Sequence, residues 1–216
     1  MMEFPQSAAY GKKIPFVQLK KQGLPARFSE WMKSLVWAYK LSPATMNLAA
    51  TESVREIEVM DLTLKEKCST LRTLATLITA IDRLIPSPII FRILDEGGEG
   101  RGVAFNLKAS GGALYGTSDV FRLFRTEGDV ALPSGVVDLE SFFKNLAAST
   151  AGMTVLPDET LKELDTRHYR AESLRADLAD IEKKISKEVQ LDRKYALAKG
   201  KQKIVKEIKQ CQNSKK

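Results

Sequence analysis

The chain of 216 residues carries a formal net charge of +7 at pH 7, and 44% of its residues are hydrophobic. This composition excludes a wholly disordered protein, because enough apolar surface is available to form a core. No apolar run approaches the roughly 20 residues that a membrane-spanning helix needs, so we expect no membrane partner. Cys68 and Cys211 lie far apart in the sequence, which favours a reducing, cytoplasmic location over a disulfide-bonded fold.

The N-terminal stretch is irregular and punctuated by proline and glycine. Residues 26–33 then predict a first helix. Residues 35–41 are rich in aromatic and β-branched side chains and predict a strand, which Pro43 ends because proline cannot continue a ladder. Residues 45–48 predict a short extension.

The next two elements are read from the spacing of their apolar residues. Residues 55–64 predict a strand with a bulge or a change of face, because the apolar phase slips between Met60 and Leu62. Residues 69–85 place apolar side chains three and four apart, which predicts a helix with one apolar stripe that ends at Pro86.

A three-stranded meander is expected after this helix. Residues 88–94 form a short apolar run, typical of a buried strand, and a glycine-rich turn follows over residues 95–102. Residues 103–108 and 119–126 alternate as strands. Asp138 is a good N-cap for the helix that follows.

The distribution of charge along the sequence separates an N-terminal body from a C-terminal arm that ends in basic residues. We expect an α+β body over residues 1–150, with a small, mostly antiparallel sheet and packed helices. Residues 151–157 are the expected linker, and residues 158–216 form a long helical, coiled-coil-like arm. The last 25 residues, 192–216, hold nine Lys/Arg and two Asp/Glu, so the arm ends in a basic tip.

The arm carries an apolar seam and two possible arrangements. No proline follows Pro157, and Asp158 can cap a helix. A single helix over residues 158–210 would be a rod of roughly 80 Å, whereas two shorter helices would fold as a hairpin. Gly200 favours a hinge or turn near its position, because glycine weakens a helix. The seam follows a heptad pattern through Leu174, Leu178, Ile181 and Ile185.

Three glycines, Gly98, Gly100 and Gly102, follow a predicted strand and raise the question of a phosphate-binding loop. A dinucleotide fingerprint requires a helix directly after the glycines, because the helix N-terminus binds the phosphate. Another strand is expected here instead, so a hairpin turn is favoured.

An acidic cluster on the second strand suggests a metal-dependent nuclease as one possible enzyme. Glu56, Glu58 and Asp61 would supply metal ligands, and Lys65 would lie on the same strand face as Asp61. The short acid-x-Lys signature of such nucleases is absent. A solvated strand face is therefore the favoured interpretation, and we predict no catalytic residues, no metal and no cofactor.

His168 is the only histidine and lies in the arm. Without a nearby cysteine cluster it cannot build a zinc site, so a structural role is favoured. Trp31, Trp37 and Tyr39 lie beside Lys33 and Lys40 and could stack on bases. Core packing is the favoured interpretation for these aromatic residues.

The basic tip is the strongest candidate for a binding surface. Its residues would contact phosphates in a salt-dependent and sequence-independent way. The alternative is a solvated, lysine-rich helix end that the helix dipole favours. The candidate nucleic-acid-binding residues are Arg193, Lys194, Lys199, Lys201, Lys203, Lys206 and Lys209.

Three ordered blocks carry a resemblance to a known family. They are a Trp-x-Tyr-Lys-Leu block from Trp37, a Glu-Ile-x-Val strand from Glu56, and an Ile-Asp-x-x-Ile-Pro-x-Pro-Ile-x-Phe block from Ile81. The chain resembles the bacterial domain-of-unknown-function family 4391 over most of its length, including the arm. The resemblance implies association with helicases or DNA methyltransferases in restriction-like or phage-defence gene clusters. Lys40, Thr45 and Asn47 match its polar motif positions.

Three functional hypotheses follow. The leading one is a non-catalytic accessory subunit of a bacterial DNA-processing complex, in which the arm's seam docks a partner or a second copy and the basic tip approaches nucleic acid. The second is the nuclease built on Glu56, Glu58 and Asp61. The third is a homodimeric coiled-coil module without a role on DNA.

Overall fold

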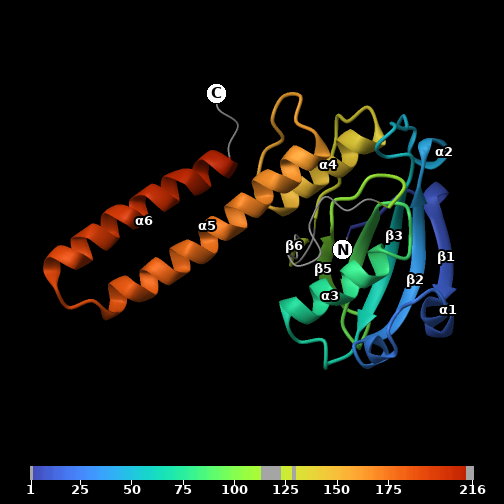
Figure 1. The fold of residues 1–216 in the computed structure, drawn as a ribbon. Coiled ribbons are helices and arrows are strands. Elements are labelled where there is room, and N and C mark those ends of the chain that lie inside the picture. Colours follow the sequence, from blue (N-terminus) through green and yellow to red (C-terminus); the bar gives the residue numbers. More distant parts are fainter. Residues whose placement is uncertain (1, 113–122, 128–129, 213–216) are drawn as a thin grey trace. The chain divides into compact units, whose positions relative to one another are not determined.

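The computed structural model describes residues 2–112, 123–127 and 130–212, and it separates into two compact units (Figure 1). Unit 1 spans Met1–Ala151 and unit 2 spans Gly152–Lys216. Each unit is described by itself.

Unit 1 is built on a six-stranded sheet whose strands neighbour one another in chain order. Every described pair is antiparallel except β3 and β4, which are parallel and are connected through helix α3, Leu71–Asp82. The unit is therefore α+β with a mostly antiparallel sheet, as predicted. The strands are β1 Ala9–Ile14, β2 Met32–Leu41, β3 Ile57–Leu64, β4 Ile89–Leu94, β5 Gly100–Phe105 and β6 Phe124–Thr126.

Helices cover both faces of this sheet. On one face, α3 packs its apolar stripe, including Leu77 and Ile78, against Met60 and Phe91 (Figure 1). On the other face, Phe143 of helix α4, Leu139–Thr150, lies with its ring centroid 5.4 Å from that of Phe105. Strand β3 is buried on both faces, which explains why its apolar residues do not alternate.

The glycine-rich segment after β4 is a hairpin turn, as predicted. The amide of Asp95 donates to the carbonyl of Glu99, and β4 and β5 pair antiparallel. Asp138 caps α4 by accepting from the amide of Ser141 at 2.6 Å, also as predicted. The early part of the strand expected over residues 119–126 lies outside the described residues, and β6 is its described end.

The first 50 residues differ most from the prediction. The helix expected over residues 26–33 is a short 3-10 turn, Ala26–Glu30, and β2 begins directly after it. The expected extension at residues 45–48 is a short helix, α2, Pro43–Met46. The irregular N-terminal stretch contains a 3-10 turn, Gln6–Ala8, strand β1 and helix α1, Phe16–Lys21.

A bulge in β2 separates aromatic residues that simple alternation would place together. Trp37 pairs with Met60 and Tyr39 with Val59, so Ala38 is an extra residue in β2. Tyr39 packs against Phe4 and lies beneath the Arg92 guanidinium, whereas Trp37 packs against Tyr10 on the face that carries Met60. Trp37 and Tyr39 therefore lie on opposite faces of the sheet. Trp31 packs against Phe28, at the edge of the core.

Unit 2 is an antiparallel helical hairpin. Helix α5, Leu161–Lys187, begins with a capping box formed by Thr160 and Glu163, while Asp158, at φ 55°, lies before the helix and does not cap it. The chain reverses at residues 188–190, and helix α6, Leu191–Gln212, packs back along α5 (Figure 1). The single-rod arrangement is therefore wrong and the hairpin is correct.

Gly200 is not the hinge, because it lies inside α6. A Cβ built at Gly200 would lie 3.0 Å from Cδ1 of Ile181, so the missing side chain lets the two helices approach closely. The predicted seam of α5 is half-buried and faces α6. The matching seam of α6 includes Leu197, Ile204, Ile208 and Cys211.

Candidate nucleic-acid interface and polar sites

A row of lysines occupies the side of α6 that faces away from α5. Lys199, Lys203, Lys206 and Lys209 recur at intervals of four and three residues, so they share one side of the helix, and all four are exposed. Their spacing along the helix axis is about 4.5–6 Å. We call these residues the lysine row.

The lysine row carries little negative charge nearby. Asp192 and Glu207 are the acidic residues of α6, and Glu207 is bound by Arg170 of α5 at 3.2 Å. Within the described part of the chain, no salt bridge of the lysine row is found. These ammonium groups are therefore available to an external anion.

The remaining basic candidates occupy different positions. Lys201 lies on the seam side of α6 and pairs with Glu182 of α5 at 2.8 Å, so its ammonium group is engaged within the hairpin. Arg193 and Lys194 are exposed beside the turn at residues 188–190. Because the chain reverses there, the basic residues do not gather at one free end. The expected basic tip is instead a charged side along α6.

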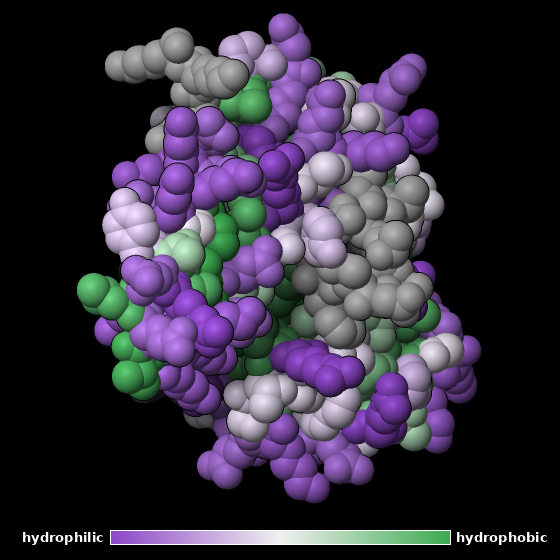
Figure 2. Space-filling view, turned by 60° about the vertical axis from the view of Figure 1, so that its left-hand side comes forward, coloured by the Kyte–Doolittle hydropathy of each residue, from purple (hydrophilic) through white to green (hydrophobic). Residues whose placement is uncertain are grey.

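The turn of the hairpin also exposes large apolar side chains. Val189 is 92% exposed, Leu191 is 81% exposed, and Tyr195 follows one helical turn later at 75%. In the space-filling view, hydrophilic residues cover most of the visible face and hydrophobic residues show as smaller groups among them (Figure 2). Exposed apolar groups of this kind often mark a protein interface.

A second polar cluster lies on the α3 side of the sheet, where β2 ends and β3 begins. Nζ of Lys40 lies 2.7 Å from Oε2 of Glu56, and the Ser87 hydroxyl donates to Oε1 of Glu56 at 3.0 Å. Glu58 pairs with Lys40 in the strand register and is only 2% exposed. Oε2 of Glu58 is buried and has no hydrogen-bond partner in the described residues.

The charges of this cluster shift one another's protonation. Hydrogen bonding to Glu56 raises the pKa of Lys40, and hydrogen bonding to Lys40 lowers the pKa of Glu56. Burial, and then the negative charge of Glu56, raise the pKa of Glu58 to about 7. The cluster therefore contains a carboxyl that changes charge near neutral pH, although its burial closes it to a large substrate.

Sequence reasoning missed a fully buried polar network beside this cluster. Nζ of Lys108 donates to the carbonyls of Asp82 and Ile85 at 2.9 and 2.7 Å and to Oδ1 of Asp82 at 3.3 Å. Asn106 donates to Oδ2 of Asp82 at 2.6 Å. Lys108 thereby satisfies free carbonyls at the C-terminal end of α3, which makes the network structural. The sequence feature that could have indicated this network is Asp82, an acidic residue inside the mostly apolar block that begins at Ile81.

Two of the three family-motif candidates have local structural roles. The Thr45 hydroxyl accepts from the Ser42 amide at 2.9 Å and donates to the Lys40 carbonyl at 2.9 Å, which fixes the start of α2. Asn47 ends α2 in a left-handed conformation at φ 54°, which asparagine tolerates better than most residues. Lys40 is the motif candidate whose charged group forms part of a cluster.

The acidic residues of the nuclease hypothesis do not converge. Asp61 lies on the opposite face of β3 from Glu58, and both its oxygens accept from Arg92, at 2.6 and 2.8 Å. Lys65 donates to the carbonyl of Ser29 instead of approaching either carboxylate. No group of three or more His, Cys, Asp or Glu suited to a metal occurs among the described residues. His168 is buried in α5.

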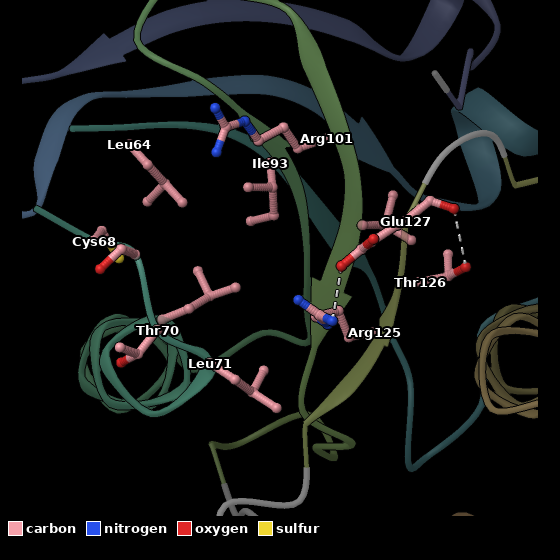
Figure 3. A pocket seen from close by; sticks show the side chains of 12 residues that line it. Leu64, Cys68, Thr70, Leu71, Ile93, Arg101, Arg125, Thr126 and Glu127 are labelled. Atoms are coloured by element: carbon pink, nitrogen blue, oxygen red, sulfur yellow. Dashed lines mark hydrogen bonds and ion pairs between the residues drawn. The ribbon is translucent and has the colours of Figure 1, made fainter. Parts of the chain in front are cut away.

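A groove lies at the carboxyl ends of β3 and β4, beside the first turn of α3 (Figure 3). Its volume is about 450 Å³. Cys68 lies at its edge, and burial raises the pKa of that thiol to about 11, so it is not a nucleophile at neutral pH. The lining residues are Leu64, Cys68, Ser69, Thr70, Leu71, Leu74, Ile93, Arg101, Val103, Arg125, Thr126 and Glu127.

In the described part of the chain, no helix is both long enough and apolar enough to cross a bilayer. No curated protein and no solved structure gives a significant match to the chain. One family model, described as Domain of unknown function (DUF4391), matches residues 2–110. The match spans β1 to β5 and leaves out β6, α4 and the hairpin, so it is shorter than the expected resemblance, which included the arm. The residues matched make up half of the chain, and the protein belongs to the DUF4391 family.

Proposed function

We propose that this protein is a non-catalytic accessory subunit of a bacterial DNA-processing complex of the restriction-like or phage-defence type. The lysine row of α6 contacts nucleic acid, and the partner is a helicase or a DNA methyltransferase. The observation that carries the proposal is the alignment of Lys199, Lys203, Lys206 and Lys209 on one exposed side of a helix.

The chemistry of the lysine row suits a phosphate backbone. Lysine binds phosphate as a flexible point charge and does not require a fixed geometry. Ammonium groups about 4.5–6 Å apart along a helix can each approach a different phosphate of a duplex. Such contacts position a protein on DNA without reading its sequence, as an accessory subunit requires.

Partner docking is assigned to the hairpin turn rather than to the seam. The seam of α5 is already covered by α6 of the same chain, so it is not free to receive a partner. Val189, Leu191 and Tyr195 are the large apolar side chains that the hairpin leaves most exposed. Burying them against a partner would be favourable.

Fluorescence anisotropy with a labelled duplex tests the DNA contact. The test variant carries Lys199→Gln, Lys203→Gln, Lys206→Gln and Lys209→Gln. The matched control removes the same charge from unit 1, through Lys12→Gln, Lys13→Gln, Lys20→Gln and Lys21→Gln, all exposed residues. Truncation after Leu191 is a poorer test, because it removes α6 and uncovers the seam of α5.

We expect the α6 variant to lose at least tenfold in affinity at about 0.1 M salt and the control to lose much less. Equal losses in both variants would show that net charge alone drives binding, and unchanged affinity in the α6 variant would remove the lysine row from the proposal. Co-purification from the native host, with mass spectrometry, should find a helicase or methyltransferase whose recovery falls in a Leu191→Ser variant.

A further inference from the structure

The groove of Figure 3 lies where sheets that contain parallel strands bind ligands. β3 and β4 are the parallel pair of this sheet, and α3 connects them. In such units the crevice at the carboxyl ends of the strands is the usual ligand site. The groove opens at Leu64 and Ile93, near those ends, and its volume of about 450 Å³ is in the range of small-molecule sites.

A β-bulge directs an arginine into this groove. Ile93 pairs with Gly102 and Leu94 with Gly100, so Arg101 is an extra residue in β5. Figure 3 shows Arg101 above Ile93 at one edge of the groove, with its guanidinium toward Leu64, and Arg125 from β6 at the opposite side, beyond Ile93. Gly102 allows β6 to lie this close, because a Cβ there would be 2.0 Å from the carbonyl oxygen of Thr126.

Both arginines are held by weak ion pairs. Nε of Arg101 lies 3.7 Å from Oδ2 of Asp95, and the Arg101 side chain is 66% exposed. Arg125 pairs with Glu127 at 2.9 Å, but Glu127 is largely exposed to solvent. Exposed ion pairs of this kind contribute little to the free energy of folding, so a bound anion can replace the carboxylates as the partner of each arginine.

The rest of the lining suits a flat apolar group. Leu64, Leu71, Leu74 and Ile93 form an apolar floor, and Ser69 and Thr70 line the groove just before the first turn of α3. Guanidinium groups bind phosphate with paired hydrogen bonds. The N-terminal turn of α3, with Thr70 and Leu71, lines a different side of the groove from Arg101, and its dipole adds positive potential there (Figure 3).

We infer that this groove binds a nucleoside 5′-phosphomonoester, with the base on the apolar floor and the phosphate between Arg101 and Arg125. The ligand is either a free mononucleotide or the phosphorylated 5′ end of a DNA strand. The site is separate from the lysine row and stands whether or not α6 binds DNA.

Titration of the full-length protein with the four common 5′-mononucleotides, followed by methyl NMR and calorimetry, tests this inference. We expect saturable binding of at least one nucleotide, with shifts of the Leu71 and Ile93 methyl signals. Adenosine and inorganic phosphate should each bind more weakly than AMP, because each lacks half of the contacts. A 5′-phosphorylated oligonucleotide compared with its 5′-hydroxyl form separates the two sources of the ligand.

Arg101→Gln and Arg125→Gln should each weaken nucleotide binding about tenfold or more. The matched control is Arg83→Gln, an exposed arginine just after the other end of α3, and it should bind as the unmodified protein does. The inference is overturned by the absence of saturation with every nucleotide up to about 10 mM. It is equally overturned by an equal loss in Arg83→Gln, or by shifts confined to methyl groups outside the groove.

Discussion

Glu58 is the residue whose protonation should be visible in the stability of the protein. Its folded-state pKa of about 7 lies above the ordinary value of 4.5, because burial and Glu56 disfavour the charged form. Protonated Glu58 therefore favours the folded state. This contribution is fully present below pH 4.5 and is lost as the pH rises through 7.

A Glu58→Gln variant should remove this dependence, since glutamine keeps the shape and cannot ionise. Relative to the unmodified protein, we expect the variant to gain up to about 3 kcal/mol in free energy of unfolding between pH 5 and pH 8. Urea denaturation at both pH values measures the difference. Glu99→Gln, in the exposed turn between β4 and β5, is the control and should show no comparable gain. A gain of equal size at both pH values would contradict the assignment.

The sheet face on which a residue lies could be predicted from the sequence only where strand alternation is regular. The bulge at Ala38 puts Trp37 and Tyr39 on opposite faces, and sequence spacing contains no sign of it. Lys108 is fully buried because free carbonyls at the end of α3 need donors, a requirement that appears only when the chain is folded. The sequence grouped the basic residues of α6 into one tip because they cluster along the chain, whereas the separation of the lysine row from Lys201 required the position of α5.

At the scale of elements, the sequence predicted correctly those helices and turns whose formation depends on residues close together in the chain. The apolar stripe of α3, the Asp138 cap of α4 and the glycines of the β4–β5 hairpin each act within a few residues of chain. β1 was missed because it is almost wholly exposed and has no apolar alternation. The hairpin turn at residues 188–190 contains neither glycine nor proline, whereas Gly200 marks a close helix contact instead of a turn.

The contact between Gly200 and Ile181 can be measured with a double-mutant cycle. Alanine in place of glycine inside a helix normally gains about 1 kcal/mol. In Gly200→Ala we expect less than this, because the new Cβ would lie 3.0 Å from Cδ1 of Ile181. In the Ile181→Val background, which lacks that atom, the full gain of about 1 kcal/mol should return. Hydrogen exchange of α6 amides reports the stability of the hairpin, and equal gains in both backgrounds would rule out the contact.

For the whole molecule, the division into a sheet-based unit and a hairpin separates two kinds of surface. Unit 1 contains the family match, the buried charge network and the groove, whereas unit 2 contains the lysine row and the exposed apolar turn. If the hairpin supplies the DNA contact, binding should depend on salt through unit 2 alone. The affinity of the unmodified protein at one salt concentration combines direct phosphate contacts with the general attraction of a basic protein to DNA.

The salt dependence of binding makes this distinction. Each phosphate contact by a lysine adds about −0.9 to the slope of log K against log salt, so neutralising the four residues of the lysine row should make the slope shallower by up to about 3.6. The unit 1 control, which changes net charge equally at Lys12, Lys13, Lys20 and Lys21, should keep the slope of the unmodified protein. Anisotropy titrations at several salt concentrations give both slopes. If the slope of the unit 1 control becomes as shallow as that of the α6 variant, binding depends on the total charge of the protein. The proposed DNA contact by the hairpin would then be wrong.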